Sequence, residues 1–354
     1  MLVKTERQIF ADRNINSMNA NKITELNFDE ICDYTENVAQ RFKSFVVINE
    51  KRKPHFKIDE EFRVIYKTSR GEVRCADITE YAFSQLCAQL GLPASYVKKC
   101  FENDKIELAL TNFRAWSGEI ERNLVFKEYQ GVIRGVVTEH YKPFTNRQVC
   151  DTLRKSVDLE RYMPVQANIQ PESLNIRFIE REKMLVEGDK SPIWNGFQVG
   201  NNDVGGGALS IKDFMYRQWC TNGMSISIFN GTALRQSHKG INASNGKIVE
   251  FTKIINGISE YKNEKIKLIG KSANKVLDME QYKMFIERVS ANLRLSENSE
   301  NSLVHIINQH YANNGNGLTE WSVINGITQF AQQQELEKRL DMEQYAGKLL
   351  TSTR

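Results

Sequence analysis

The chain has 354 residues, of which 40% are hydrophobic and 26% are charged, and its formal net charge is +4 at pH 7. This composition can bury a sizeable core, which excludes a disordered chain and leaves room for two domains or one large one. The sequence does not start with the apolar segment of a signal peptide, and no apolar run approaches the roughly 20 residues that span a bilayer, so we expect a cytoplasmic protein without a membrane partner.

The first part of the chain is expected to change from a loose arm to a mixed α/β region. Residues 1–27 are polar and rich in asparagine, which predicts a flexible arm. A mixed region is expected over residues 28–110, beginning with a helix to about Phe42, then a short strand over 45–48 and a strand pair over 62–66 and 72–76.

Residues 77–101 have the spacing of two helices joined by a tight turn. Gly91 is placed to end the first helix, and Pro93 to begin the second. One interpretation is a DNA-binding helix-turn-helix that presents Ser95, Lys98 and Lys99 to the major groove. The other is an αα-hairpin packed into a core, which is the commoner use of this pattern.

A β-rich central domain is expected over residues 111–247. The clearest hairpin joins strands at 122–129 and 132–138 through Gln130-Gly131, and a helix then begins at a capping box formed by Thr145 and Gln148. The remaining elements predicted are strands over 174–180, 196–200 and 208–211, a short helix over 214–220, and a strand over 224–229.

From Ile248 the apolar period changes to that of a helix, which predicts a helical region over residues 248–354. The fold class that follows is α+β, with a central antiparallel β-rich region flanked by helices and a helical C-terminal third. Charge is unevenly distributed: residues 210–275 hold eleven Lys and Arg against four Asp and Glu, whereas residues 276–354 hold seven against ten. The basic stretch could neutralise a phosphate backbone, or it could be a solvated face in which Glu260 and Glu264 offset the lysines.

The sequence offers no catalytic constellation. The six cysteines and five histidines are scattered without metal-ligand spacing, so neither a metal site nor a cofactor is expected. Gly205-Gly206-Gly207 could cradle a phosphate, but it lacks the flanking residues of the known phosphate loops and favours a turn between strands. Asp203, Glu187 and Asp189 could be magnesium ligands, although turn formation also accounts for them.

Four separated segments carry a resemblance to a known family. They are GVIRGVVTEHYKPFTN from Gly131, NGFQVGNNDVGGGALSI from Asn195, YRQWCTNGM from Tyr216 and LTEWSVINGITQF from Leu318. The chain resembles, from about Ile78 to Leu350, a phage- and plasmid-encoded family catalogued as a domain of unknown function. The resemblance implies a mobile-element origin and an α+β fold, and it brings no catalytic residues.

Three functional hypotheses remain open at this point, and an enzyme is a further alternative if Asp203 and the glycine-rich turn converge with distant groups on a pocket. The first is a non-enzymatic protein of phage or plasmid DNA metabolism that binds single-stranded nucleic acid, acts in annealing or recombination, and forms a homo-oligomer. Its expected contacts are Arg134, Lys142, Arg147, Arg217, Arg235, His238 and Lys239. The others are a helix-turn-helix regulator and a counter-defence or host-takeover protein that binds a host protein in the bacterial cytoplasm.

Overall fold

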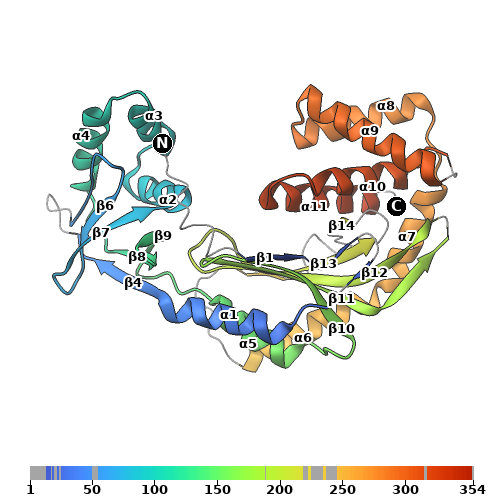
Figure 1. Ribbon diagram of the computed structural model, residues 1–354, viewed down its shortest axis with the longest axis horizontal. Coiled ribbons are helices and arrows are strands. Elements are labelled where there is room, and N and C mark those ends of the chain that lie inside the picture. Colours follow the sequence, from blue (N-terminus) through green and yellow to red (C-terminus); the bar gives the residue numbers. More distant parts are fainter. Residues whose placement is uncertain are drawn as a thin grey trace.

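The computed structural model describes most of the chain, and it shows an α+β protein built on two sheets (Figure 1). The described residues are 13–16, 18–19, 22–23, 25–49, 55–187, 189–217, 222–224, 234–236, 245–314 and 317–352. The expected fold class is therefore confirmed. No helix in these ranges is both long and apolar enough to cross a membrane.

The smaller sheet has six strands in the order β4-β8-β9-β7-β6-β5. Its strands are β4 (Phe42–Val47), β5 (Phe56–Ile58), β6 (Val64–Lys67), β7 (Val73–Ile78), β8 (Leu124–Tyr129) and β9 (Val132–Thr138). The predicted hairpin between β8 and β9 is confirmed, and its turn residues Gln130 and Gly131 both have positive φ. Since β4 pairs with β8, this sheet takes strands from both sides of residue 111, where the sequence suggested a boundary.

Three helices complete this N-terminal lobe: α2 (Glu80–Leu90), α3 (Ala94–Glu102) and α4 (Ile106–Ser117). Gly91 ends α2 in the left-handed conformation, as its position in the sequence predicted, because glycine adopts positive φ without a steric cost. The helices share one apolar core with the sheet, in which Phe83, Val97 and Phe126 are buried.

The larger sheet has seven strands, six of them in the order β1-β10-β11-β12-β13-β14, while β15 also pairs with β13. Its strands are β1 (Arg13–Asn16), β10 (Tyr162–Ile169), β11 (Ser173–Val186), β12 (Asp189–Asn202), β13 (Leu209–Arg217), β14 (Asn222–Met224) and β15 (Leu234–Gln236). A separate pair, β2 (Met18–Asn19) and β3 (Lys22–Ile23), precedes α1. Part of the expected N-terminal arm thus forms an edge strand, because β1 pairs with β10.

Three helices cover one face of the larger sheet: α1 (Phe28–Arg41), α5 (Asn146–Ser156) and α6 (Asn245–Glu260) (Figure 1). Every second strand residue points toward them, and Phe178, Phe197 and Ile211 are among those buried there. The predicted capping box of α5 is confirmed at Thr145 and Gln148.

The C-terminal third is helical, as predicted, with α7 to α11 beside one end of the larger sheet (Figure 1). These helices are α7 (Lys262–Asn274), α8 (Met279–Leu293), α9 (Glu297–Asn314), α10 (Glu320–Ala331) and α11 (Leu336–Ser352). A second apolar core joins them to the sheet through Ile193 and Met215.

The predicted helix over residues 214–220 is wrong, because residues 214–217 end the strand β13. Phe214, Met215 and Tyr216 are all buried, since both faces of the sheet are covered at this point. A strand that is buried on both sides loses the alternation of apolar and polar residues that identifies a strand in sequence. The rest of this predicted helix, residues 218–220, lies outside the described ranges. A strand was also predicted over residues 224–229; Met224 ends β14, and residues 225–229 lie outside the described ranges.

Candidate nucleic-acid interface

The larger sheet has a polar face on the side opposite α1, α5 and α6. Directly opposed residues of antiparallel strands project to the same face, and the register gives one continuous row across β10, β11, β12, β13 and β15. That row is Asn168, Asn175, Gly200, Ser210 and Arg235. Asn168, Asn175 and Ser210 are partly exposed, and Arg235 is exposed. Five neighbouring strands at about 4.8 Å spacing make a row about 19 Å long.

A second polar row lies beside the first, two residues further along each strand: Gln166, Arg177, Gln198 and Lys212. Arg177 is 1% exposed and donates to Gln198 Oε1 and Gln166 Oε1, both at 2.9 Å. It also forms an ion pair with the fully buried Glu343 of α11. Burial lowers the pKa of the Arg177 guanidinium, and the charge of Glu343 opposes this. Arg177, Gln166 and Gln198 of this row therefore contribute mainly to holding α11 on the sheet. We call the two rows together the polar sheet face.

Three cations, Lys212, Arg235 and Lys348, lie near one another where the polar sheet face meets α11. Lys212 lies beside Gln344, with 3.4 Å between Nζ and Oε1. Burial lowers the pKa of Lys212; the positive charges of Arg235, Lys348 and Arg177 act in the same direction, and Asp341 opposes them. Asp341 offsets part of the repulsion on Lys212, and Glu343 neutralises Arg177. The positive charge that remains on Lys212, Arg235 and Lys348 would attract an anion.

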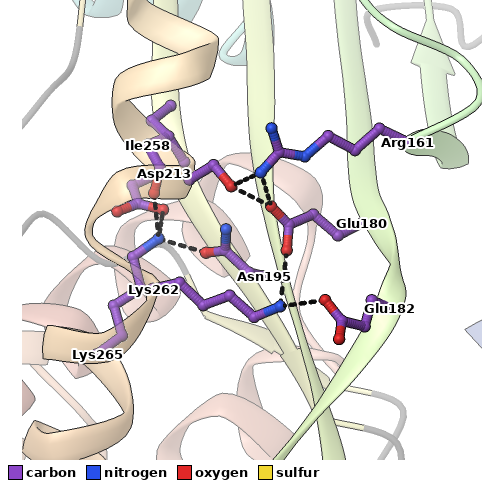
Figure 2. A network of polar contacts seen from close by, with 9 residues as sticks. Arg161, Glu180, Glu182, Asn195, Asp213, Ile258, Lys262 and Lys265 are labelled. Atoms are coloured by element: carbon purple, nitrogen blue, oxygen red, sulfur yellow. Dashed lines mark hydrogen bonds and ion pairs between the residues drawn. The ribbon is translucent and has the colours of Figure 1, made fainter.

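The basic stretch of residues 210–275 is partly neutralised by strand residues that the sequence could not place. Lys262 pairs with Glu182 at 2.9 Å and with Glu180 at 3.3 Å, while Lys265 pairs with Asp213 (Figure 2). Lys265 is fully buried between α7 and the sheet. These two lysines therefore hold α7 in place and are not presented to a ligand.

The ionisation of this network follows from its burial. Burial raises the pKa of Asp213 to about 6, even though Lys265 opposes the shift. Burial also lowers the pKa of Lys265, and Asp213 opposes that change. Burial disfavours the charge on Glu180 as well, but the hydrogen bond from Ser259 and the charge of Lys262 hold its pKa below the ordinary value.

Of the contacts expected from sequence, Arg235 lies on the polar sheet face. Lys142 is exposed in the segment between β9 and α5. Arg147 is exposed on α5, on the helical side of the sheet, where it pairs with Glu36 at 3.1 Å. His238 and Lys239 lie outside the described residues. The structure thus does not bring Arg147 and Arg235 to one surface.

The other two expected contacts are buried beside carboxylates. Arg134 is 6% exposed, and its Nη1 lies 3.5 Å from Glu172. Arg217 is 4% exposed and donates to Asp189 from Nε at 2.5 Å and from Nη2 at 2.7 Å. Trp321 Nε1 donates to the same carboxylate at 2.7 Å, which joins β12, β13 and α10. Both arginines therefore serve the fold, Arg134 through Glu172 and Arg217 through Asp189. Asp189 is the acceptor for Arg217 and Trp321 and is not available as a metal ligand.

The Gly205-Gly206-Gly207 segment is a turn between β12 and β13 that fixes the junction of the two lobes. Asp203 in this turn accepts from the backbone of Asn146 at 2.8 Å and from Asn201 Nδ2 at 3.1 Å. Burial raises the pKa of Asp203 to about 7, while the Asn146 hydrogen bond and the charge of Lys127 oppose it. Among the described residues there is no group of three His, Cys, Asp or Glu side chains arranged to hold a metal ion.

The helix pair α2–α3 packs into the N-terminal lobe as an αα-hairpin. Lys98 forms an ion pair with Glu80 of α2, and Ser95 and Lys99 are exposed. The opposite side of α3 packs into the core of the lobe, where Val97 and Cys100 are buried.

Sequence reasoning missed most of the polar sheet face. Asn168, Asn175, Ser210 and Lys212 come from three strands, and only Ser210 lies in a segment that carries the family resemblance. The one available signal was the alternation of polar and apolar residues in residues 208–213, which predicts a strand with one polar side. Strand register, which aligns these residues, depends on pairing across the whole sheet.

Comparison with known protein families identifies where this chain belongs. A family described as "Domain of unknown function (DUF932)" matches residues 134–352, which is more than half of the chain, so the chain belongs to this family. The match contains the larger sheet from β10 onward, α5 and all of the C-terminal helices. Comparisons with curated proteins and with solved structures returned no match.

Proposed function

We propose that this DUF932 protein binds single-stranded nucleic acid on its polar sheet face, as a non-enzymatic protein of phage or plasmid DNA metabolism that acts in annealing or recombination. The observation that carries the proposal is the continuous row from Asn168 to Arg235, which is partly exposed. Lys212 of the second row and Lys348 of α11 add positive charge near its Arg235 end. The matched family and the resemblance to mobile-element proteins provide the setting.

The chemistry of this face favours a single strand over a duplex. Amide and hydroxyl side chains both donate and accept hydrogen bonds, as the Watson–Crick edges of unpaired bases do. In a duplex those edges are paired, and readout requires an element that enters a groove. The cation cluster adds contacts with phosphate, and oligomerisation would extend the face along a strand.

Fluorescence anisotropy tests this directly. A labelled single strand of mixed sequence and its duplex are titrated with the full chain, and the single strand is expected to bind more tightly. Replacing Asn175 and Ser210 by Ala should weaken the single-strand complex without changing its salt dependence, because neutral side chains release no counterions. Equal affinity for both forms, or unchanged affinity in the Asn175→Ala/Ser210→Ala variant, would refute the proposal.

A second candidate function has one supporting observation. Leu108 and Trp116 of α4 are 48% and 50% exposed, and this apolar surface suits a protein partner better than a nucleic acid. This surface would serve the counter-defence or host-takeover hypothesis, in which the protein binds a host protein. A pull-down with the full chain would then recover a protein partner even after nuclease treatment. A Trp116→Glu variant would lose that partner and keep any binding to single strands.

A further inference from the structure

The N-terminal lobe holds a cavity of about 390 Å³ that lies outside the matched family region. It is formed at the edge of the six-stranded sheet by β5, β6, β7 and the last turn of α4. This volume is within the range of small-molecule sites, about 300–1,000 Å³. The cavity is lined by His55, Phe56, Lys57, Ile65, Tyr66, Lys67, Val73, Arg114 and Ser117.

The charge of this cavity has one sign. Lys57, Lys67 and Arg114 are exposed at its rim, and no Asp or Glu is among its lining residues. None of the three forms an ion pair within 4.0 Å with another residue in the described part of the chain. Two other arginines of this lobe do have carboxylate partners: Arg63 pairs with Asp59 at 2.9 Å, and Arg74 pairs with Glu128 at 2.8 Å. The cavity therefore concentrates positive charge that its own walls do not neutralise.

The remaining lining is mostly apolar. Val73 is 68% exposed although it lies in a strand, and Ile65 on the adjacent strand is partly exposed. Lys67 and Val73 are register partners, so a cation and an exposed apolar side chain stand next to each other on one face. The Tyr66 hydroxyl donates to Glu128 at 2.7 Å, so it is already committed within the fold. The surface thus combines cations with apolar area that a ligand would cover.

We propose that this cavity binds a small organic phosphate with an apolar body. The phosphate is held by Lys57, Lys67 and Arg114, and the apolar body lies against Ile65 and Val73. Arginine and lysine supply several charge-assisted hydrogen bonds to phosphate oxygens, and covering Val73 and Ile65 removes apolar area from water. This site is separate from the polar sheet face and does not depend on it.

Isothermal titration of the full chain with three probes tests both parts of the proposal. The probes are 1-naphthyl phosphate, 1-naphthol with the same apolar body, and inorganic phosphate with the same anion. Naphthyl phosphate is expected to bind at least tenfold more tightly than either of the others. Naphthol binding with equal affinity would overturn the role of the cations, and inorganic phosphate binding with equal affinity would overturn the role of the apolar wall.

Variants then assign the binding to this cavity. Lys67→Gln and Arg114→Gln should each weaken naphthyl phosphate binding on the order of tenfold, because each removes one charge-assisted contact. Val73→Glu should abolish it, and this exposed position tolerates the change without loss of the fold. Lys99→Gln on α3 is the matched control, since Lys99 is exposed in the same lobe but does not line the cavity. Unchanged binding in Val73→Glu, or equal losses in Lys99→Gln and Lys67→Gln, would place the probe elsewhere and refute the site.

Discussion

The carboxyl group of Asp203 shows how one residue couples the fold to pH. It accepts hydrogen bonds from Asn146 and Asn201 at the junction of the lobes, and burial still raises its pKa from 3.8 to about 7. A raised pKa in the folded state means that the folded protein binds a proton that the unfolded chain has released. The protonated Asp203 therefore makes its full contribution to the free energy of unfolding below about pH 4, and this contribution is lost as the pH rises through about 7.

Replacing Asp203 with Asn should therefore change the pH dependence of stability. Asn cannot ionise, so the free energy of unfolding of the variant should rise relative to that of the wild type as the pH rises from about 4 to about 8. We expect a change of about 2 kcal/mol, which is less than the full pKa shift would give because the side chain keeps some contact with water. Denaturant unfolding at a series of pH values measures the difference. A difference in free energy of unfolding that stays constant across this range would show that Asp203 ionises normally in the folded protein.

At the scale of single elements, α11 is held on the sheet by a buried charge. Glu343 is fully buried, and it accepts from Arg177 of β11, from Arg339 Nε at 2.9 Å and from Gln332 Nε2 at 3.1 Å. Both arginines would be left without their carboxylate if Glu343 were removed. The position of α11 sets where Lys348 lies relative to the polar sheet face, so this contact also shapes the proposed interface.

Glu343→Ala should destabilise the protein by about 3–5 kcal/mol, which is the cost of leaving a buried charge without its partner. Glu343→Gln keeps an acceptor oxygen and should cost less. Denaturant unfolding gives the free energies, and hydrogen exchange should show earlier opening of α11 than of α5. As a control, Asp341→Asn at an exposed position of α11 should change stability by less than about 0.5 kcal/mol. A loss in Glu343→Ala no larger than in Asp341→Asn would contradict this account.

Elements with a local signal were predictable from sequence, and elements defined by pairing were not. The β8–β9 hairpin and the caps of α2 and α5 were identified because turn and cap residues act within a few positions. The end of β13 was missed because its residues are buried on both faces. The polar sheet face was missed because it consists of residues from five strands that only register aligns.

At the scale of the whole molecule, the two lobes meet where the β12–β13 turn contacts the smaller sheet. Gly135 of β9 lies so close to Val204 that an added Cβ atom would be 2.3 Å from Val204 Cβ. Gln85 of α2 donates to the carbonyl oxygen of Val204 at 2.7 Å. The turn is therefore packed against the smaller sheet, and the missing side chain of Gly135 is what allows this close approach.

Gly135→Ala should disturb this junction and destabilise the protein by about 1–3 kcal/mol, the usual cost of inserting a methyl group into a packed site. Gly207→Ala in the same turn is the matched control, because its added Cβ would be 3.7 Å from the nearest described atom, an ordinary contact. Thermal unfolding of both variants measures the difference. Equal midpoints for the two variants would show that the lobes are not packed tightly at Gly135.

The salt dependence of single-strand binding tests the central claim most directly. Each phosphate contact contributes about 0.7 to the slope of log affinity against log salt concentration, so replacing Lys212, Arg235 and Lys348 by Gln should reduce that slope by about 2 between about 50 and 200 mM salt. A control that replaces the exposed Arg70, Lys99 and Lys283 by Gln removes the same charge away from the polar sheet face and should leave the slope unchanged. Equal slopes for both triple variants, or no binding by the wild type, would contradict the proposed interface.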